Sequence, residues 1–346
     1  MSQSAPFLLS TRGQSRDLGA FVVAARFSRD GSRVGFALGD GSVWTMAAAG
    51  DPGWTQTTVH DGAILDFAAD PAGQGFISAG DDGQVRRLDA EGHVSDVASF
   101  GMKWVEHVAT YALDKGKGLI AASAGKVVRL FDQTGRLLKE LTHPSTVTGL
   151  TFDGKGKRVV ASHYNGVSIW FVAAKTDTPR KLEWKGSHTA VAMHPEGEAV
   201  VTAMQENALH GWKLPDGQHM RMSGYPAKTA SLSFSRNGKW LATSGADAMV
   251  LWPFFGGGPM GKAPLELAGG DGVVCTRVAA NPANEIVAGG FTDGLVVVAD
   301  INSSRILPVV PPEHGPISTL AWNPDGTKLA VGTETGFAAV VDFTKR

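Results

Sequence analysis

One short turn recurs eight times along this chain at a nearly constant spacing. Successive copies begin 40 to 46 residues apart. The copies read FSRDG (27–31), ADPAG (69–73), ALDKG (112–116), FDGKG (152–156), MHPEG (193–197), FSRNG (234–238), ANPAN (280–284) and WNPDG (322–326). A spacing this regular indicates a chain that is built from eight copies of one structural unit.

Each unit contains four short runs that are typical of β-strands. An apolar run precedes the turn, and a second one follows it, as in RVGFAL (33–38) and KLAVGT (328–333). Pairs such as Asp40-Gly41 and Asn165-Gly166 come next, and they suit two-residue hairpins because Asn, Asp and Gly tolerate positive φ. The third run ends near a large residue, and the fourth is more polar. The third-run residues are Trp44, Leu88, Phe131, Trp170, Trp212, Trp252, Val298 and Val341.

Four strands per unit is the composition of one propeller blade. We therefore predict an all-β chain in which residues 1–346 form a single eight-bladed β-propeller. Its blades would begin near residues 18, 60, 103, 143, 184, 225, 271 and 313. The last unit ends near residue 343 after its third strand, so the segment PFLLST (6–11) is predicted to supply the fourth and close the ring. A seven-bladed ring with one unit outside it, or a frayed N-terminus, is the alternative.

The repeats resemble those of the WD40 family. The segments SAGDDGQVRRLDAEG (78–92) and LATSGADAMVLWP (241–253) carry the likeness, which extends over roughly residues 18–343. The Trp-Asp pair of that family never occurs here, and its Gly-His pair is missing from the place before the first strand of each repeat. In the family a His, a strand Ser or Thr, a hairpin Asp and a Trp form a hydrogen-bonded tetrad. Blade two approaches it with His60, Ser78 and Asp82 but lacks the Trp, so we expect packing to hold most blades.

The overall composition indicates a globular protein without a strong charge. Lys and Arg number 32 against 33 Asp and Glu, so we predict neither nucleic acid nor a membrane as a partner. Cys275 is the only cysteine, which excludes an internal disulfide. The first residues lack a signal-peptide pattern, and no apolar run approaches the roughly 18 residues of a membrane span. We expect a cytoplasmic monomer of bacterial type.

A few charged or metal-ligating residues fall near the predicted central channel. Asp66 and Arg277 occupy one aligned position on the inner strands. His107, His188 and Cys275 share another, five residues before the turn, in blades three, five and seven. Blades three, five and seven are not neighbours, so we predict no shared metal ion there. No nucleophile elbow or phosphate loop is found, and we predict no cofactor and no enzymatic activity. The alternative is a small-ligand or metal-dependent enzyme that uses Asp66, His107 and Arg277 at the channel mouth.

Aromatic residues and histidines gather in the loops that lead into the inner strands. We predict that they bind a partner, with the alternative that each ring caps its own blade. The candidates are His60, Trp104, His143, Trp184, Tyr225 and His314, with Tyr164 in a neighbouring hairpin. An insertion, PFFGGGPMGKAP (253–264), falls on the opposite face and offers Phe254 and Phe255. The alternative for this pair is a loop that folds back on the blade.

The sequence thus favours a scaffold that binds one or more proteins through a propeller face. The first alternative is the enzyme or ligand binder at the channel mouth. The second is a structural subunit of a larger complex that completes its ring with a strand from a partner. That arrangement would require PFLLST not to dock.

Overall fold

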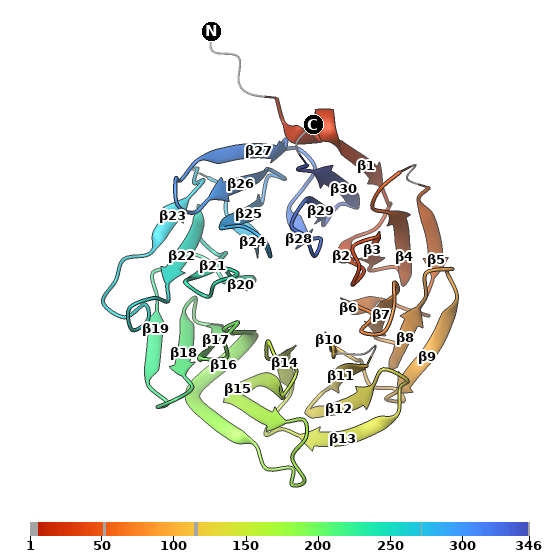
Figure 1. Ribbon diagram of the computed structural model, residues 1–346, viewed down its shortest axis with the longest axis vertical. Coiled ribbons are helices and arrows are strands. Elements are labelled where there is room, and N and C mark those ends of the chain that lie inside the picture. The colour runs from red at the N-terminus through yellow and green to blue at the C-terminus, as the bar shows by residue number, and fades with distance from the viewer. Residues whose placement is uncertain (1–5, 51–52, 114–116, 271, 345–346) are drawn as a thin grey trace.

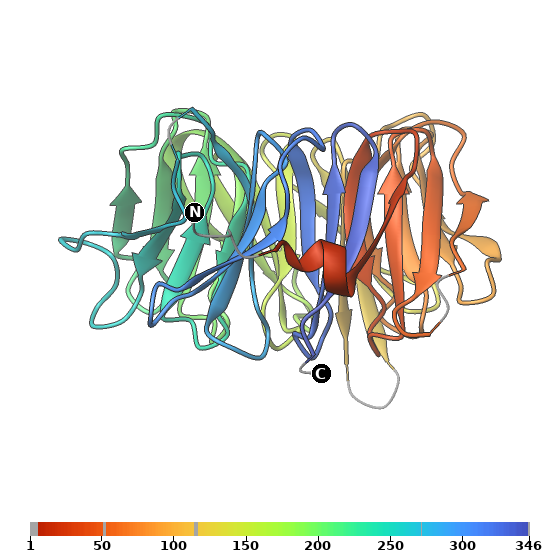
Figure 2. The same ribbon diagram turned by 90° about the horizontal axis from the view of Figure 1, so that it is seen from above.

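The chain forms a ring of antiparallel β-sheets around a central axis (Figure 1). The computed structural model describes residues 6–50, 53–113, 117–270 and 272–344. Residues 114–116 of the third turn and the blade start predicted at 271 lie outside the described residues. In side view the strands run between two faces made of loops and turns (Figure 2).

Six sheets have four strands each, and every one holds one sequence repeat. From the axis outwards, the first three are β2 (Val22–Phe27), β3 (Arg33–Leu38), β4 (Ser42–Ala47), β5 (Thr55–Thr58); β6 (Ile64–Ala69), β7 (Phe76–Gly80), β8 (Gln84–Leu88), β9 (Val94–Ser99); and β10 (His107–Ala112), β11 (Gly118–Ala124), β12 (Val127–Asp132), β13 (Leu137–Thr142). The others are β20 (Leu232–Phe234), β21 (Trp240–Thr243), β22 (Met249–Pro253), β23 (Leu265–Leu267); β24 (Cys275–Ala280), β25 (Ile286–Phe291), β26 (Val296–Asp300), β27 (Ile306–Val310); and β28 (Ile317–Trp322), β29 (Lys328–Thr333), β30 (Phe337–Asp342), β1 (Gly13–Asp17).

The seventh sheet has six strands and holds the fourth and fifth repeats together. Its strands are β14 (Val147–Phe152), β15 (Arg158–Phe171), β16 (Arg180–Met193), β17 (Ala199–Met204), β18 (Leu209–Lys213) and β19 (His219–Met222). Strand β15 reverses at Asn165 and Gly166, which have φ of 66° and 143°, and the amide of Val172 donates to the carbonyl of Lys157. Strand β16 pairs with β15 through its first half and with β17 through its second half.

The ring therefore has seven hydrogen-bonded sheets, which is the alternative count and not the predicted eight separate ones. The difference arises because β16 is the outer strand of the fourth repeat and continues as the inner strand of the fifth. All eight repeats surround the axis, with neighbouring inner segments in the order β2, β6, β10, β14, the second half of β16, β20, β24 and β28 (Figure 1). No repeat lies outside the ring.

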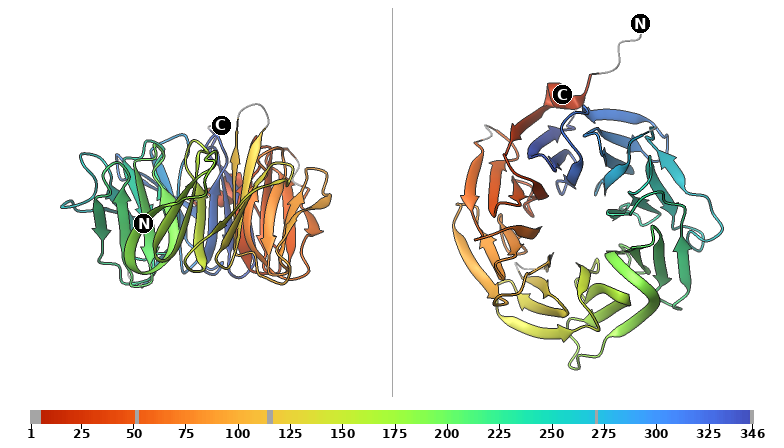
Figure 3. Two further views of the ribbon diagram at one scale, coloured as in Figure 1. Left: turned by 90° about the horizontal axis from the view of Figure 1, so that it is seen from below. Right: turned by 180° about the vertical axis from the view of Figure 1, so that it is seen from behind.

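The N-terminal segment closes the ring, but not with the predicted residues. Residues 8–11 of the predicted strand belong instead to a short helix, α1 (Leu8–Arg12), that lies on the rim. The closing strand is β1, which pairs along its whole length with β30. The guanidinium of Arg12 donates to the carbonyl of Thr344 at 3.1 Å, so the two ends of the described chain lie side by side (Figure 3).

The core lies between neighbouring sheets. One cluster joins Ala37 and Val43 of the first repeat to Ile64, Phe67 and Phe76 of the second. The rings of Phe67 and Phe76 stack with centroids 5.0 Å apart. Each repeat therefore buries its apolar face only against the next one, and the ring has to close for all of them to be covered.

Hydroxyl side chains tie several inner strands to the strand that follows. The pairing register shifts near the start of β14, β24 and β28, and the residue left out of register turns its side chain towards the next repeat. Ser318 donates to the carbonyl of Val22 at 2.6 Å, Thr276 to Ile317 at 2.7 Å, and Thr148 to His188. The small polar residues of the inner strands thus satisfy backbone groups between the repeats.

We expect the substitution Ser318→Ala to lower the free energy of unfolding by about 1–2 kcal/mol. Ser318 is buried, and its loss leaves the carbonyl of Val22 without its side-chain donor between the last and first repeats. Urea denaturation would measure the change. Ser95→Ala on the exposed side of β9 is the matched control, with an expected change below about 0.5 kcal/mol. Equal effects of the two substitutions would contradict this role of Ser318.

Candidate functional site

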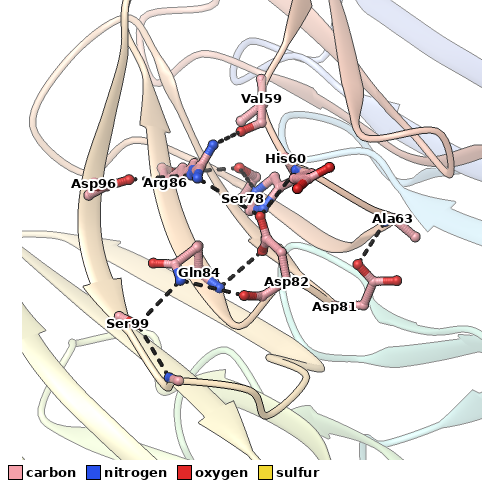
Figure 4. A network of polar contacts seen from close by, with 12 residues as sticks. Val59, His60, Ala63, Ser78, Asp81, Asp82, Gln84, Arg86, Asp96 and Ser99 are labelled. Atoms are coloured by element: carbon pink, nitrogen blue, oxygen red, sulfur yellow. Dashed lines mark hydrogen bonds and ion pairs between the residues drawn. The ribbon is translucent and has the colours of Figure 1, made fainter.

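His60 lies inside the second repeat in the network predicted from the sequence (Figure 4). Its Nδ1 is 2.9 Å from a carboxylate oxygen of Asp82, and its Nε2 is 2.8 Å from Oγ of Ser78. Arg86, from the neighbouring strand, donates to the carbonyl of Val59. Burial lowers the pKa of His60 despite the nearby Asp82. This histidine caps its own blade, so it offers no surface to a partner.

The fourth and sixth repeats build similar networks at the same position. The indole Nε1 of Trp170 donates to Nε2 of His143 at 3.0 Å. Trp252 donates to the hydroxyl of Tyr225 at 2.6 Å, and this hydroxyl is 2.6 Å from Oγ1 of Thr243. His143 and Tyr225 are buried, which fits the alternative that each ring caps its own blade and not the prediction of a binding surface. The prediction that packing holds most blades did not include the hydrogen bonds of these two repeats.

The fifth repeat breaks this pattern. Trp184 occupies the position of His143 and Tyr225, and an indole has no acceptor to offer. In the described residues, Nε1 of Trp212 and Nδ1 of His210 are two of six buried side-chain atoms without a hydrogen-bond partner, and Nε1 of Trp44 in the first repeat is another. Trp184 stacks on His210 with ring centroids 4.0 Å apart and stays 37% exposed. An incomplete buried network is a cost to stability, and such costs tend to accompany function.

We expect Trp212→Phe to cost at least about 1 kcal/mol less stability than either Trp170→Phe or Trp252→Phe. All three changes remove similar volume, but the last two also leave a buried acceptor without its donor, whereas the first removes an unpaired donor. Thermal and urea denaturation of the three variants would measure the differences. Equal losses in all three would show that Trp212 is satisfied in solution, for example by water.

A cavity of about 870 Å³ opens beside Trp184. Tyr164, which is 53% exposed, lines it together with Trp184. The amide of Tyr164 donates to Oγ of Ser145 at 2.9 Å, and Oδ1 of Asn165 accepts from the amide of Gly186 at 3.1 Å. These bonds fix the β15 reversal against the part of β16 that carries Trp184. We call the cavity and its two aromatic rings the Trp184 site.

The Trp184 site belongs to a basic sector of the chain. Residues 103–185 contain 14 Lys and Arg against 7 Asp and Glu, although the net charge of the whole protein is −1. Lys181 and Lys185 line the cavity and are exposed, as is Lys126. Within the described ranges, carboxylates pair with Lys139 and Lys328 and with none of these three lysines. The net charge of the whole chain, −1, gave no sign of this sector.

The other candidates in these loops differ in exposure. Trp104 is 62% exposed on the same face as Trp184, in the loop into the third repeat. His314 is half-buried, with its ring stacked on Phe337 at a centroid distance of 3.9 Å. Tyr164, Trp104 and Trp184 are thus the exposed residues of this group. Their role in binding a partner stays a prediction.

The insertion on the opposite face folds back on its blade. Phe254 packs edge-on against Phe234 at 5.0 Å, and Phe255 packs edge-on against Trp240 at 5.2 Å. Phe255 stays exposed and borders a second cavity of about 560 Å³. The loop between β22 and β23 projects from the rim (Figure 1). The pair thus fits the alternative of a folded-back loop more closely than that of a free hook.

Two of the three channel candidates, Asp66 and Arg277, bond to the following inner strand, and His107 lies beside Asp66 on that strand. A carboxylate oxygen of Asp66 accepts from the amide of Val108 at 3.0 Å and lies 4.0 Å from Nδ1 of His107. Arg277, on β24, donates from Nε to the carbonyl of Ser318 at 2.6 Å. Burial lowers the pKa of Arg277. Asp66 and Arg277 lie in repeats that are not neighbours and act as ties between inner strands.

One group of possible metal ligands lies within reach of a single ion in the described residues. It consists of Asp89, Glu91 and His93 in the turn after β8. Asp89 already accepts hydrogen bonds from the amides of Glu91 and His93 in this turn. These bonds explain the cluster as an ordinary turn.

Comparisons with known proteins agree with the ring of repeats. The model for the WD domain, G-beta repeat matches residues 220–252, and that for the anaphase-promoting complex subunit 4 WD40 domain matches residues 278–346. Similar curated proteins include autophagy-related protein 16 of Arabidopsis thaliana, 24% identical over 64% of this chain and 44% of its own length. Telomerase protein component 1 of Rattus norvegicus is 26% identical over 63% of this chain and 8% of its own length. The chain thus spans less than half of these relatives.

A solved structure with the same fold is the computationally designed Ika8 protein. It superposes with a TM-score of 0.74, covering 94% of this chain and 98% of its own, at 20% identity. An identity this low shows the architecture alone. No helix in the described part of the chain is long and apolar enough to cross a bilayer.

Proposed function

Because the chain is a WD40-repeat β-propeller, we propose that it is a protein-binding scaffold that holds its partner at the Trp184 site. Two relatives carry names that place them in larger processes, autophagy-related protein 16 and pre-mRNA-processing factor 19 homolog 2 of Arabidopsis thaliana, the latter 24% identical over 39% of this chain. These names support a role among other proteins and specify no partner. Fold alone does not assign a site, so the choice of surface rests on the geometry.

The observation that carries the proposal is the exposed Trp184 in a repeat whose buried network stays incomplete. At the same position, His143 and Tyr225 are buried and complete the network of their own blade. Trp184 instead lies beside Tyr164 at a cavity, and large aromatic rings at pockets are typical binding hot spots. A repeat that gives up internal hydrogen bonds and exposes an aromatic ring is best explained by a contact outside the chain.

A pull-down of the tagged protein from its native lysate tests this proposal. The variant Tyr164→Ser/Trp184→Ser should lose a stoichiometric protein partner that the wild type retains. Trp104→Ser on the same face and Phe255→Ser on the opposite face test the other two exposed aromatic candidates, and both should keep the partner. Circular dichroism would confirm that each variant folds. A partner lost with Phe255→Ser and kept with the double variant would place the binding surface on the other face.

The pairing of β1 with β30 argues against completion of the ring by a strand from a partner. That possibility needs the outer edge of β30 to be open, and β1 pairs with five of its six residues, from Phe337 to Val341. We retain a cytoplasmic location and a monomeric state of the isolated chain as predictions. Light scattering coupled to gel filtration would test the second against the chain mass of 36.2 kDa.

A further inference from the structure

We propose that the Trp184 site binds an extended acidic segment of a protein partner. The inference rests on the proposed scaffold function and adds the chemical class of the partner. It follows from the aromatic rings, the arrangement of charges along β16 and the size of the cavity.

The cavity has the size and chemistry of a side-chain pocket. Its volume of about 870 Å³ lies within the range of roughly 300–1,000 Å³ that is typical of ligand sites. Tyr164 and Trp184 supply apolar area, and the buried Leu182 and Val167 complete the apolar part of the wall. An aromatic or aliphatic side chain of the partner can pack on these apolar groups in the cavity.

The charges around the cavity select an acidic partner. Lys181 and Lys185 line the cavity at two points of β16. The carbonyl of Lys126 accepts the amide of His143, whose neighbour Pro144 is part of the wall, so Lys126 lies beside the site. All three lysines lack a carboxylate partner in the described residues, so their ammonium groups are available to a bound chain. Complementary charge of this kind directs encounter and fixes orientation.

The order of charges along β16 favours a peptide over a nucleic acid. Glu183 lies between Lys181 and Lys185, and all three are exposed. A phosphate backbone carries a charge at every nucleotide and would face this carboxylate, whereas a peptide can place a neutral residue there. The register of β16 shifts between Glu183 and Ser187, so Lys185 lies outside the regularly paired part of the strand. An extended segment with acidic residues on both sides of an apolar one matches this arrangement.

A phage-displayed library of random twelve-residue peptides, selected on the full-length protein, tests the proposal. Enriched peptides should carry a net negative charge and at least one large apolar residue. Their affinity, measured by fluorescence anisotropy, should fall at least tenfold with Tyr164→Ser/Trp184→Ser and with Lys181→Glu/Lys185→Glu. Lys155→Glu/Lys157→Glu is the matched control, since these exposed lysines lie in the same basic sector on the opposite face. This control should change the affinity less than twofold.

Several outcomes would overturn the proposal. They are the enrichment of neutral or basic peptides, the failure to enrich any peptide, and equal effects of the two lysine variants. Tighter binding of a twelve-nucleotide oligouridine at the same residues would assign the site to nucleic acid. If a lysate partner is lost with Tyr164→Ser/Trp184→Ser but kept with Lys181→Glu/Lys185→Glu, the scaffold function stands and the acidic segment is excluded.

Discussion

A chain that lacks residues 1–17 is expected to lose its cooperative fold and aggregate, whereas a chain that lacks residues 1–12 should still fold. The first deletion removes β1, the strand that pairs with β30 at five consecutive positions. It uncovers a sheet edge whose residues Ala339 and Val341 are buried in the intact ring. Open edges of this kind pair with other chains, and a ring that cannot close leaves the last repeat without its fourth strand.

The shorter deletion isolates the contribution of α1. It removes Leu8 and Leu9, which pack on the apolar cluster of the last two repeats, and the bond from Arg12 to Thr344. Partial burial of two leucines suggests a loss of about 1–3 kcal/mol. Thermal denaturation by circular dichroism and gel filtration would separate the two variants. A chain without residues 1–17 that melts at the wild-type temperature would show that β1 is dispensable.

The repeat architecture was predictable because it depends on local chemistry. Turns such as FSRDG and hairpins such as Asp82-Gly83 need particular backbone conformations, and the chain repeats them at a fixed spacing. The His60 network was predictable for the same reason, since its three residues hold fixed places within one repeat. The count of separate sheets was not, because β16 runs from one repeat into the next without a break.

The closing strand was misplaced because the prediction weighed apolarity. PFLLST looks like a strand, yet β1 is the polar segment GQSRD with most of its side chains exposed. An outer strand is held by backbone hydrogen bonds to its neighbour, and these leave no trace in side-chain hydropathy. The helix α1 instead uses the apolar leucines to pack against the rim.

The Trp184 site was only half visible in the sequence. Alignment of the repeats puts His60, His143, Trp184 and Tyr225 at one position and gives no reason to separate them. They differ in whether the side chain accepts a hydrogen bond from within the blade, and only the structure shows this for each repeat. The basic sector could have been found by counting charges repeat by repeat.

Stability is expected to fall steeply as the pH drops from 7 to 5. Burial lowers the pKa of several histidines, most strongly that of His143, to about 4, and that of His210, to about 3. In the unfolded chain both titrate near the ordinary value of about 6.5. Between these values the unfolded state binds more protons than the folded state, so acid favours unfolding. Each of the two should cost about 1–2 kcal/mol between pH 7 and pH 5.

Burial also lowers the pKa of His60, His163 and His188, which adds to the loss in the same window. Carboxylates contribute little there: hydrogen bonds, first from the Thr134 hydroxyl, lower the pKa of Asp132 to about 2, and its unfolded value is near 4. Stability that depends on such carboxylates is lost only below about pH 5. The window from pH 7 to pH 5 therefore isolates the histidines.

Urea denaturation at pH 7, 6 and 5 would measure this loss and assign it. The variant His143→Gln should be less stable at pH 7, because Gln does not replace the buried ring that accepts from Trp170, but its stability should depend less on pH by about one proton. Ser95→Ala is the control, since it changes an exposed residue without a titratable group and should keep the pH dependence of the wild type. A free energy of unfolding that stays constant from pH 7 to pH 5 would mean that the buried histidines accept protons without unfolding. The imidazoles of His60 and His143 would then have to form other hydrogen bonds within the folded propeller. Their networks would not depend on the neutral form of the histidine.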